Sequence, residues 1–336
     1  MTGRNQFNLK LPDKRIVSAL EDKLDRIQGR SSRYGLLEKL ALRIGLIQQS
    51  LNPILQNPIL LLFAGDHQTG LKILNDPVSP AARRIHKIFM DDAPMLKLAR
   101  RVGVDIKIVD CGVHYPLEGF IDYWIHSGSL ILNRKIRGSA RDFIHEASIT
   151  TQEVHQAIAL GADMINNLYY SGTNVFLVGH LGSSCRVSTL ALAASILDID
   201  PSEIQPTIES EDELILKYAQ LALKKHPKTR DVINQIAIWG NYQIAMMVGA
   251  MLKLAEKELL FLVDDNESVL ALYTAWKLHP EVIEFAMVAQ NTSKISRSIC
   301  DCLKIEVISD FGITADEGFG ALTCFQLLQS ACDILI

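Results

Sequence analysis

Strand-length apolar runs alternate with longer helical stretches along most of the 336 residues, and this alternation limits the possible folds more than any other feature. The apolar runs of strand length are Ile59–Ala64, Ile106–Val109, Asn174–Val178, Leu259–Val263, Phe285–Ala289 and Ile305–Ile308. The helical stretches between them include Glu153–Leu168, Arg186–Leu197, Asp212–Lys225, Tyr242–Ala255 and Ser268–Leu278. Continuous apolar strands separated by helices are typical of a parallel sheet that is covered on both faces. We therefore predict an α/β fold.

The two ends of the chain are helical without intervening strands. Ile16, Leu20, Leu24 and Ile27 recur at helical spacing, and a second apolar stripe runs over residues 36–47. A further apolar helix is expected over residues 321–335. We predict that residues 1–52 and 315–336 form a small helical domain beside an α/β domain of residues 53–314.

Composition excludes several classes of protein. The net charge of -4 gives no overall basic field for nucleic acid. The polar start of the chain does not resemble a secretory signal, and no stretch reaches the roughly 18 apolar residues of a membrane span. Six scattered cysteines without a C-x-x-C pair indicate reduced thiols, which predicts a cytoplasmic protein.

Every predicted strand ends in polar or glycine residues. Ligands of open parallel sheets bind beyond the carboxyl ends of the strands, so these endings predict a ligand crevice along one edge of the sheet. The endings contain Asp66 with His67, Asp110, Gly179–Ser184, Asp264, Asn291 and Asp310.

The Gly179–Ser184 segment leads from a strand into a helix. Backbone N–H groups at such a helix start suit an anion, so this turn is a candidate phosphate cradle. A plain strand-to-helix turn is the alternative, and it stays open. The segment fits neither G-x-G-x-x-G nor a P-loop, which removes the usual support for dinucleotide and nucleoside triphosphate binding.

Asp66, His67 and His180 raise the possibility of a metal site. No H-x-H or H-x-x-x-H spacing accompanies them, so a hydrogen-bonded Asp–His pair that shapes the turn is favoured, and no metal is expected. The absence of G-x-S-x-G argues against the common layout of serine hydrolases.

Adjacent acids at Asp316 and Glu317 precede the last predicted helix, with Gly318 directly after them. A carboxylate at such a turn is a plausible general base. Acids are also favoured in the first turn of a helix by the helix dipole, so the two interpretations compete.

Taken together in chain order, these segments resemble the nicotinate-nucleotide–dimethylbenzimidazole phosphoribosyltransferase family. The family's F-A-A-D-H-G, V-D-x-G-V, R-x-G-T-R, G-G-x-E-I-A, V-D-G and E-G-T-G-A segments have counterparts over nearly the whole chain. These counterparts are Phe63–His67, Val109–Val113, Arg137–Arg141, Gly240–Ala245, Val263–Asp264 and Glu317–Ala321.

The departures from the family fall in the ligand loops. The family's G-E-M-G-I-G-N-T-T appears as residues 179–187, where His180 replaces the Glu and Cys185-Arg186-Val187 replaces Asn-Thr-Thr. The T-x-Q-M near the base pocket reads Ala81-Ala82-Arg83-Arg84. The scaffold segments persist, so the resemblance constrains the fold more than the substrate.

The resemblance implies a Rossmann-like sheet, a homodimer and no cofactor. It implies transfer of the 5-phosphoribosyl group of nicotinate mononucleotide to 5,6-dimethylbenzimidazole or a related base in cobalamin lower-ligand synthesis. A different acceptor base and a non-catalytic nucleotide-binding paralogue are the alternatives. The implied general base is Glu317, and the expected substrate-binding residues are Asp66, His67, Gly179, His180, Gly182, Ser183, Ser184, Lys217, Asp264 and Gly318.

Overall fold

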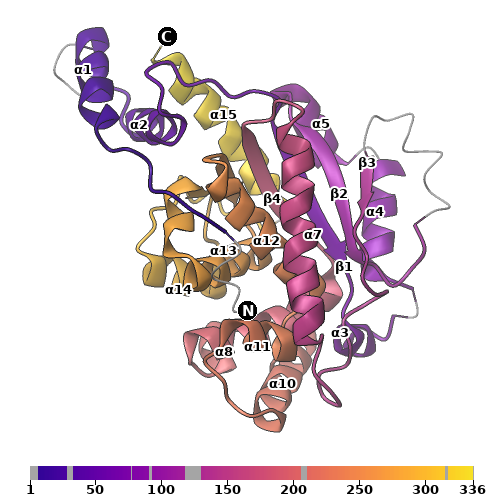
Figure 1. The fold of residues 1–336 in the computed structure, drawn as a ribbon. Helices are drawn as coiled ribbons and strands as arrows, with labels where there is room; N and C mark the ends of the chain where they lie inside the picture. The colour runs from indigo at the N-terminus through magenta and orange to yellow at the C-terminus, as the bar shows by residue number, and fades with distance from the viewer. Residues whose placement is uncertain are drawn as a thin grey trace.

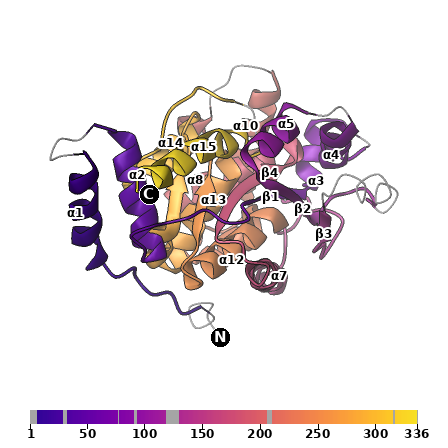
Figure 2. The ribbon, with the colours of Figure 1, turned by 90° about the horizontal axis from the view of Figure 1, so that it is seen from above.

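A computed structural model describes residues 7–28, 33–76, 78–90, 93–117, 130–205, 210–314 and 317–335. One central sheet is covered by helices on both faces (Figure 1). α7 (Thr151–Tyr169) and α12 (Tyr242–Glu256) lie on one face, whereas α5 (Pro94–Val102) and α15 (Phe319–Asp333) lie on the other (Figure 2). This arrangement confirms the predicted α/β fold.

The sheet has six strands in the order β3-β2-β1-β4-β5-β6, and all neighbouring strands are parallel. The strands are β1 Ile59–Gly65, β2 Asp105–Gly112, β3 Leu130–Asn133, β4 Val175–Leu181, β5 Leu260–Val263 and β6 Ala286–Val288. β2 and β3 follow β1 toward one edge of the sheet, whereas β4 pairs with the opposite side of β1 and is followed by β5 and β6. The topological switch point therefore lies between β1 and β4, where open sheets of this type place their ligand crevice.

One predicted strand does not form, one strand was not predicted, and one predicted strand ends too early. Ile305–Ile308 forms only an isolated bridge between Val307 and Val288, because the neighbouring strand β6 has just three residues to offer. The polar ending at Asp310 therefore does not follow a strand. The sixth strand is instead β3, which the sequence analysis missed. β4 also runs three residues past its predicted end, so Gly179, His180 and Leu181 belong to the strand.

The other helices connect the strands or flank the sheet. They are α3 Gln68–Ile73, α4 Pro80–Met90, α8 Arg186–Leu197, α9 Pro201–Ile204, α10 Ser210–Lys225, α11 Val232–Trp239, α13 Asn266–Leu278 and α14 Lys294–Leu303. Short 3-10 turns span Ser183–Cys185 and Pro280–Phe285. None of the helices in the described part of the chain combines the length and the apolar character that a membrane span needs.

The terminal helices pack together. α1 (Ile16–Gln28) lies against α2 (Leu36–Gln48), and α2 contacts α15 (Figure 1). Leu20 of α1 is fully buried in this packing. α15 also contacts β4 and α5, so the C-terminal helix reaches from the terminal helices to the central sheet. The division into a helical domain and an α/β domain stays a prediction.

Candidate active site

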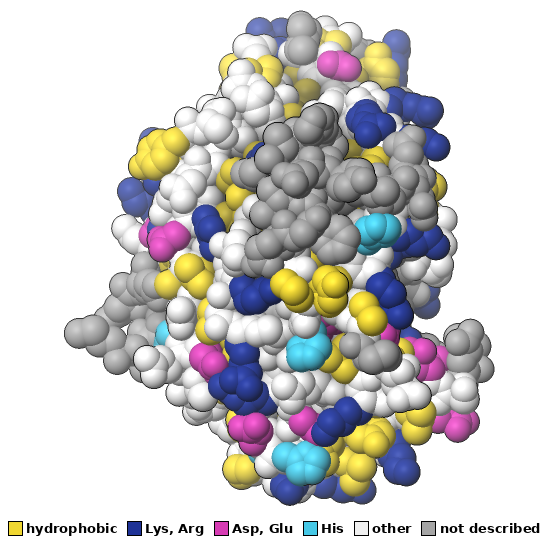
Figure 3. Space-filling view, turned by 90° about the vertical axis from the view of Figure 1, so that its right-hand side faces the viewer, with side chains coloured by type: hydrophobic (Ala, Val, Ile, Leu, Met, Phe, Trp, Pro, Cys, Tyr) yellow, Lys and Arg dark blue, Asp and Glu magenta, His cyan; other side chains and the backbone are white. Residues whose placement is uncertain are grey.

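A cavity of about 920 Å³ lies beside the carboxyl end of β4, next to the switch point. Its walls come from α4, the end of β4 and the start of α8, with contributions from the segments before α15 and at the start of α13. Of the predicted site residues, His180, Gly182, Ser183 and Glu317 line it. On the face that carries α4, Lys and Arg side chains lie beside His and apolar side chains (Figure 3).

Asp66 follows β1 and is buried at the switch point. Its Oδ1 accepts a hydrogen bond from the Ser184 hydroxyl at 2.8 Å. Its Oδ2 accepts one from the His114 backbone N–H at 2.9 Å and another from the Ser79 hydroxyl. These donors come from three segments, so the carboxylate joins the ends of β1 and β4 to the segment before α4. Asp66 is not among the residues that line the cavity.

His67 is fully buried next to Asp66. Its Nδ1 accepts from the Thr69 backbone N–H at 3.3 Å, which assigns the proton to Nε2, and Nε2 lies 3.0 Å from the Ser148 hydroxyl. Burial lowers the pKa of His67 to about 3, so the ring is neutral. His67 caps α3, and its backbone N–H donates to Ser184. The predicted hydrogen bond between Asp and His side chains is thus replaced by separate contacts: Ser184 links Asp66 to the His67 backbone N–H, and the His67 ring contacts Thr69 and Ser148.

The turn after β4 begins at Gly182. This residue has φ 139°, and a Cβ there would lie 2.1 Å from the carbonyl oxygen of Gly65. Only glycine fits so close to the end of β1. Ser183 is exposed to the cavity and Ser184 is buried, and the 3-10 turn leads directly into α8. The candidate phosphate cradle therefore has the Ser183 hydroxyl and the start of α8, whereas the Ser184 hydroxyl is hydrogen-bonded to Asp66 inside the protein.

Glu317 projects its carboxylate into the same cavity from the turn before α15. Its backbone is left-handed, with φ 78°, and Gly318 after it has φ 73°. A left-handed non-glycine residue costs about 1–3 kcal/mol, and such residues concentrate at functional sites. Arg84 of α4 donates to both oxygens of this carboxylate, from Nε to Oε1 and from Nη2 to Oε2, the latter at 2.7 Å. The predicted base is thus a buried carboxylate that is paired with a guanidinium.

Three other predicted residues, Gly179, Asp264 and Gly318, position Glu317 without lining the cavity. A Cβ on Gly179 would lie 2.7 Å from the backbone nitrogen of Gly318, so β4 contacts the backbone of this turn directly. Asp264 follows β5, and its Oδ2 accepts from the Ala321 N–H at 3.0 Å in the first turn of α15. Asp316, the other acid of the predicted pair, lies outside the described residues.

A buried acidic pair that was not predicted from the sequence, Asp265 and Glu267, lies next to His180 at the cavity wall. The His180 backbone N–H donates to Asp265 Oδ2 at 2.8 Å, and His180 Nδ1 lies 3.8 Å from Glu267 Oε2. Glu267 lines the cavity and accepts from the Thr189 hydroxyl at 3.1 Å. Burial raises the pKa of Asp265 to about 7 and also raises the pKa of Glu267. The sequence signal that could have identified Glu267 is its position three residues after Asp264, which directly follows a predicted strand.

Replacing Asp265 with Asn is expected to flatten the pH dependence of folding stability. An aspartate whose pKa is raised on folding stays protonated in the folded protein while it ionises in the unfolded chain, so stability falls as pH rises from about 4 to about 7. The asparagine variant still has an oxygen that can cap α13 but lacks this titration. Urea unfolding at about pH 5 and about pH 8 should show a loss larger by roughly 1–3 kcal/mol for the wild type. Equal losses in both proteins would contradict a raised pKa.

Lys217 does not reach the cavity. It is exposed on α10 and is not among the lining residues. Arg186, the first residue of α8, lines the cavity instead and pairs with Glu211 at 2.8 Å and with Asp212 at 2.6 Å. The cationic group beside the turn therefore comes from the helix that the turn begins.

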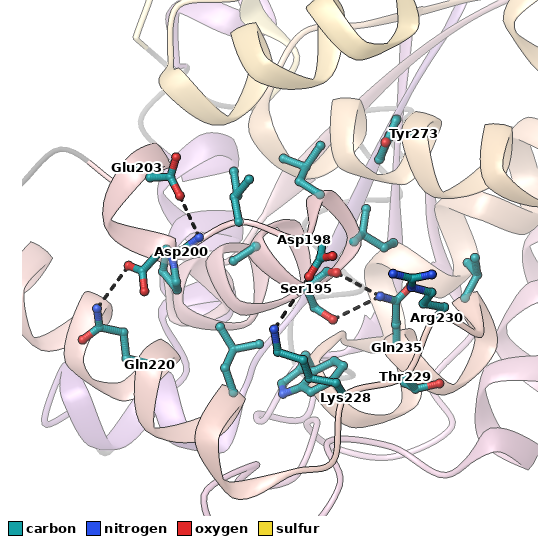
Figure 4. A pocket seen from close by; sticks show the side chains of 18 of the residues that line it. Ser195, Asp198, Asp200, Glu203, Gln220, Lys228, Thr229, Arg230, Gln235 and Tyr273 are labelled. Atoms are coloured by element: carbon teal, nitrogen blue, oxygen red, sulfur yellow. Dashed lines mark hydrogen bonds and ion pairs between the residues drawn. The ribbon is translucent and has the colours of Figure 1, made fainter.

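A second cavity, of about 1050 Å³, lies between α8, α10, α11 and α13 (Figure 4). Its polar side chains pair with one another: Gln235 donates to the Ser195 carbonyl at 3.0 Å, and Lys228 lies 3.7 Å from Asp198. None of the predicted site residues lines it. Within the described ranges, no group of three His, Cys, Asp or Glu side chains could hold a metal ion. The cavity beside β4 is therefore the candidate active site.

Comparison with known proteins agrees with this fold. A phosphoribosyltransferase family model matches residues 9–336. The nicotinate-nucleotide–dimethylbenzimidazole phosphoribosyltransferase of Parabacteroides distasonis is 29% identical over 334 residues, which cover 97% of this chain and 94% of that protein. The enzyme of the same name from Ralstonia nicotianae is 30% identical, over 90% of this chain and 85% of that protein.

A solved structure shares the fold. The crystal structure of nicotinate-nucleotide–dimethylbenzimidazole phosphoribosyltransferase from Thermus thermophilus superimposes with a TM-score of 0.84 at 20% sequence identity and covers 96% of each chain. The family match extends over nearly the entire sequence and includes every segment that builds the cavity. The chain therefore belongs to this phosphoribosyltransferase family.

Proposed function

We propose that this protein transfers the 5-phosphoribosyl group of nicotinate mononucleotide to 5,6-dimethylbenzimidazole or a related azole base. The products are an α-ribazole phosphate and nicotinate, in the synthesis of the cobalamin lower ligand. One observation carries the proposal: the buried Glu317 carboxylate, in left-handed backbone, on the wall of the cavity beside β4. The relatives' names supply the donor and the acceptor.

The reaction needs one base and no acid. The unprotonated nitrogen of the azole attacks C1′ of the donor, the bond between C1′ and the nicotinate nitrogen breaks, and its electron pair neutralises the departing pyridinium. The anomeric centre inverts from β to α. The azole then carries one proton too many, and Glu317 accepts it from the ring N–H. The elements that fix the Glu317 turn, β4 and Asp264, hold the carboxylate for this transfer.

The donor phosphate is proposed to bind at the turn after β4. Ser183 offers a hydroxyl to the cavity, and the start of α8 brings the positive end of the helix dipole to the same turn. Arg186 adds a positive charge at the same place. The cavity volume of about 920 Å³ is within the usual range for sites that enclose small molecules.

The direct test is nicotinate release from nicotinate mononucleotide by the purified protein, followed by chromatography, with and without 5,6-dimethylbenzimidazole. We expect release that depends on the azole and a ribosylated product whose anomeric configuration is α by NMR. A screen of benzimidazoles, purines and phenols identifies the preferred acceptor. If none of them causes release, the proposed activity is wrong.

A nucleotide-binding protein without turnover is the second candidate. The observation that favours it is the Arg84 guanidinium, which occupies both oxygens of the Glu317 carboxylate. Calorimetry separates the two candidates, because tight binding of nicotinate mononucleotide without release of nicotinate with any acceptor supports binding alone.

Two further properties belong to the same proposal. We propose a homodimer, as the resemblance to the family implies, and light scattering in solution tests it. All six cysteines are free thiols, which supports a reducing compartment and hence the cytoplasm.

A further inference from the structure

Arg84 and Glu317 meet across the cavity although they are 233 residues apart in the sequence. Arg84 extends from the first half of α4, and Glu317 lies in the turn before α15. The two nitrogens of the guanidinium contact the two carboxylate oxygens, so the pair is bidentate. An acceptor that gives its proton to Glu317 must approach a carboxylate that already holds a cation.

The two partners differ in their freedom to move. The Glu317 side chain is 9% exposed and its backbone turn is fixed by Gly179 and Asp264. The Arg84 side chain is 43% exposed and is attached to the helix by a long flexible stem. When an acceptor binds, the guanidinium is therefore the partner that turns away, and the carboxylate stays in place.

Displacement of Arg84 has a cost that depends on the acceptor. A neutral acceptor separates the guanidinium from its carboxylate and offers it no replacement, and such separation at a partly buried site weakens binding. An acceptor with an acidic group of its own exchanges one carboxylate for another, so Arg84 keeps a charged partner while Glu317 receives the ring proton. Lys87, on the same helix, also lines the cavity and adds positive charge.

We propose that Arg84 determines acceptor specificity, and that the preferred acceptor is an azole that carries a carboxylate or another acidic substituent. This inference rests on the proposed phosphoribosyl transfer. The acidic group replaces Glu317 as the partner of Arg84, and the ring nitrogen and ring N–H take the positions next to C1′ and Glu317. The group transfer itself is unchanged, with the ring proton passing to Glu317 and nicotinate departing with the electron pair.

The test compares benzimidazole with benzimidazole-5-carboxylate as acceptors, with nicotinate mononucleotide as donor. For the wild type we expect kcat/KM to be about fivefold higher for the carboxylate, the effect of one half-exposed charge pair. Arg84→Met should reduce this preference to less than about twofold, mainly through KM for the carboxylate. Arg84→Lys keeps the positive charge but cannot form a bidentate pair, so it should retain part of the preference. This partial retention would show that the site remains folded when Arg84 is replaced.

Arg101→Met is the matched control. Arg101 is an exposed arginine on α5 that does not line the cavity, and its replacement should leave both kcat/KM values unchanged. Equal use of the two acceptors by the wild type would overturn the inference, as would an Arg84→Met variant that keeps the full preference of the wild type.

A second source of a carboxylate is the nicotinate ring of the donor. Comparing nicotinate mononucleotide with nicotinamide mononucleotide as donors tests whether Arg84 pairs with the carboxylate of the donor instead of the acceptor. If Arg84 binds the donor, Arg84→Met should raise KM for nicotinate mononucleotide with every acceptor alike. That result would also overturn the inference. Failure of the proposed function looks different, since no variant and no acceptor would then release nicotinate.

Discussion

Replacement of Glu317 by Gln is expected to lower the turnover of nicotinate mononucleotide with an azole acceptor by roughly 10²–10⁴-fold, the range for loss of a general base. Glutamine has nearly the shape of glutamate and still accepts a hydrogen bond from Arg84, but it cannot take the ring proton. The loss should appear in kcat, and the affinity for nicotinate mononucleotide should stay within about threefold of the wild type. Single-turnover release of nicotinate measures the rate, and calorimetry measures the affinity for nicotinate mononucleotide.

Glu284→Gln is the control for this experiment. Glu284 also pairs with an arginine in a partly buried position, Arg43 at 3.1 Å, but it does not line the active-site cavity. Its replacement should leave turnover within about twofold of the wild type, because only a peripheral ion pair is lost. A Glu317→Gln enzyme that retains turnover within about threefold would show that another group accepts the proton.

Replacement of Gly182 by Ala is expected to destabilise the protein by about 3 kcal/mol or more. The added Cβ would lie 2.1 Å from the Gly65 carbonyl oxygen, and φ 139° is unfavourable for alanine. Because that carbonyl belongs to β1, relief of the clash must separate the ends of β1 and β4. Urea unfolding gives the free energy, and nicotinate release should fall in the same variant because the cavity wall moves.

Gly103→Ala separates the cost of a positive φ from the cost of the clash with β1. Gly103 also has a positive φ, 72°, but a Cβ there would meet nothing within 4 Å. Its replacement should cost only the roughly 1–2 kcal/mol of a left-handed non-glycine residue. Equal losses in the two variants would mean that close approach to β1 contributes nothing at Gly182.

The sequence predicts the parallel sheet well because its strands are continuous apolar runs buried on both faces, as in β1 and β4. It fails where a strand is short or lies at the edge. Residues 130–133 are too few to give a pattern, and Ile305–Ile308 has a strand-like pattern but only one bridge to β6. Strand pairing depends on neighbours that are distant in sequence, which no local pattern reports.

Prediction of the site had a similar limit. Among the predicted strand endings, the one after β4 lines the cavity with His180, Gly182 and Ser183, whereas Asp66, Asp110 and Asp264 do not line it. Asp66 turned out to be saturated by protein donors, because a buried carboxylate must find partners that only the folded chain brings together. Arg84 and Glu317 are 233 residues apart in the sequence, so the residues alone gave no sign of their contact.

The position of Glu317 also bears on protein synthesis. The cavity is lined by α4 and the end of β4 as well as by the turn that carries the carboxylate, which leads into α15 (Phe319–Asp333). During translation, the ribosome therefore has to release the chain as far as α15 before the site can assemble. The strands of the sheet, from β1 to β6, are released earlier and can pair before α15 covers one face of them. Strand pairing in the scaffold can therefore precede assembly of the proposed active site.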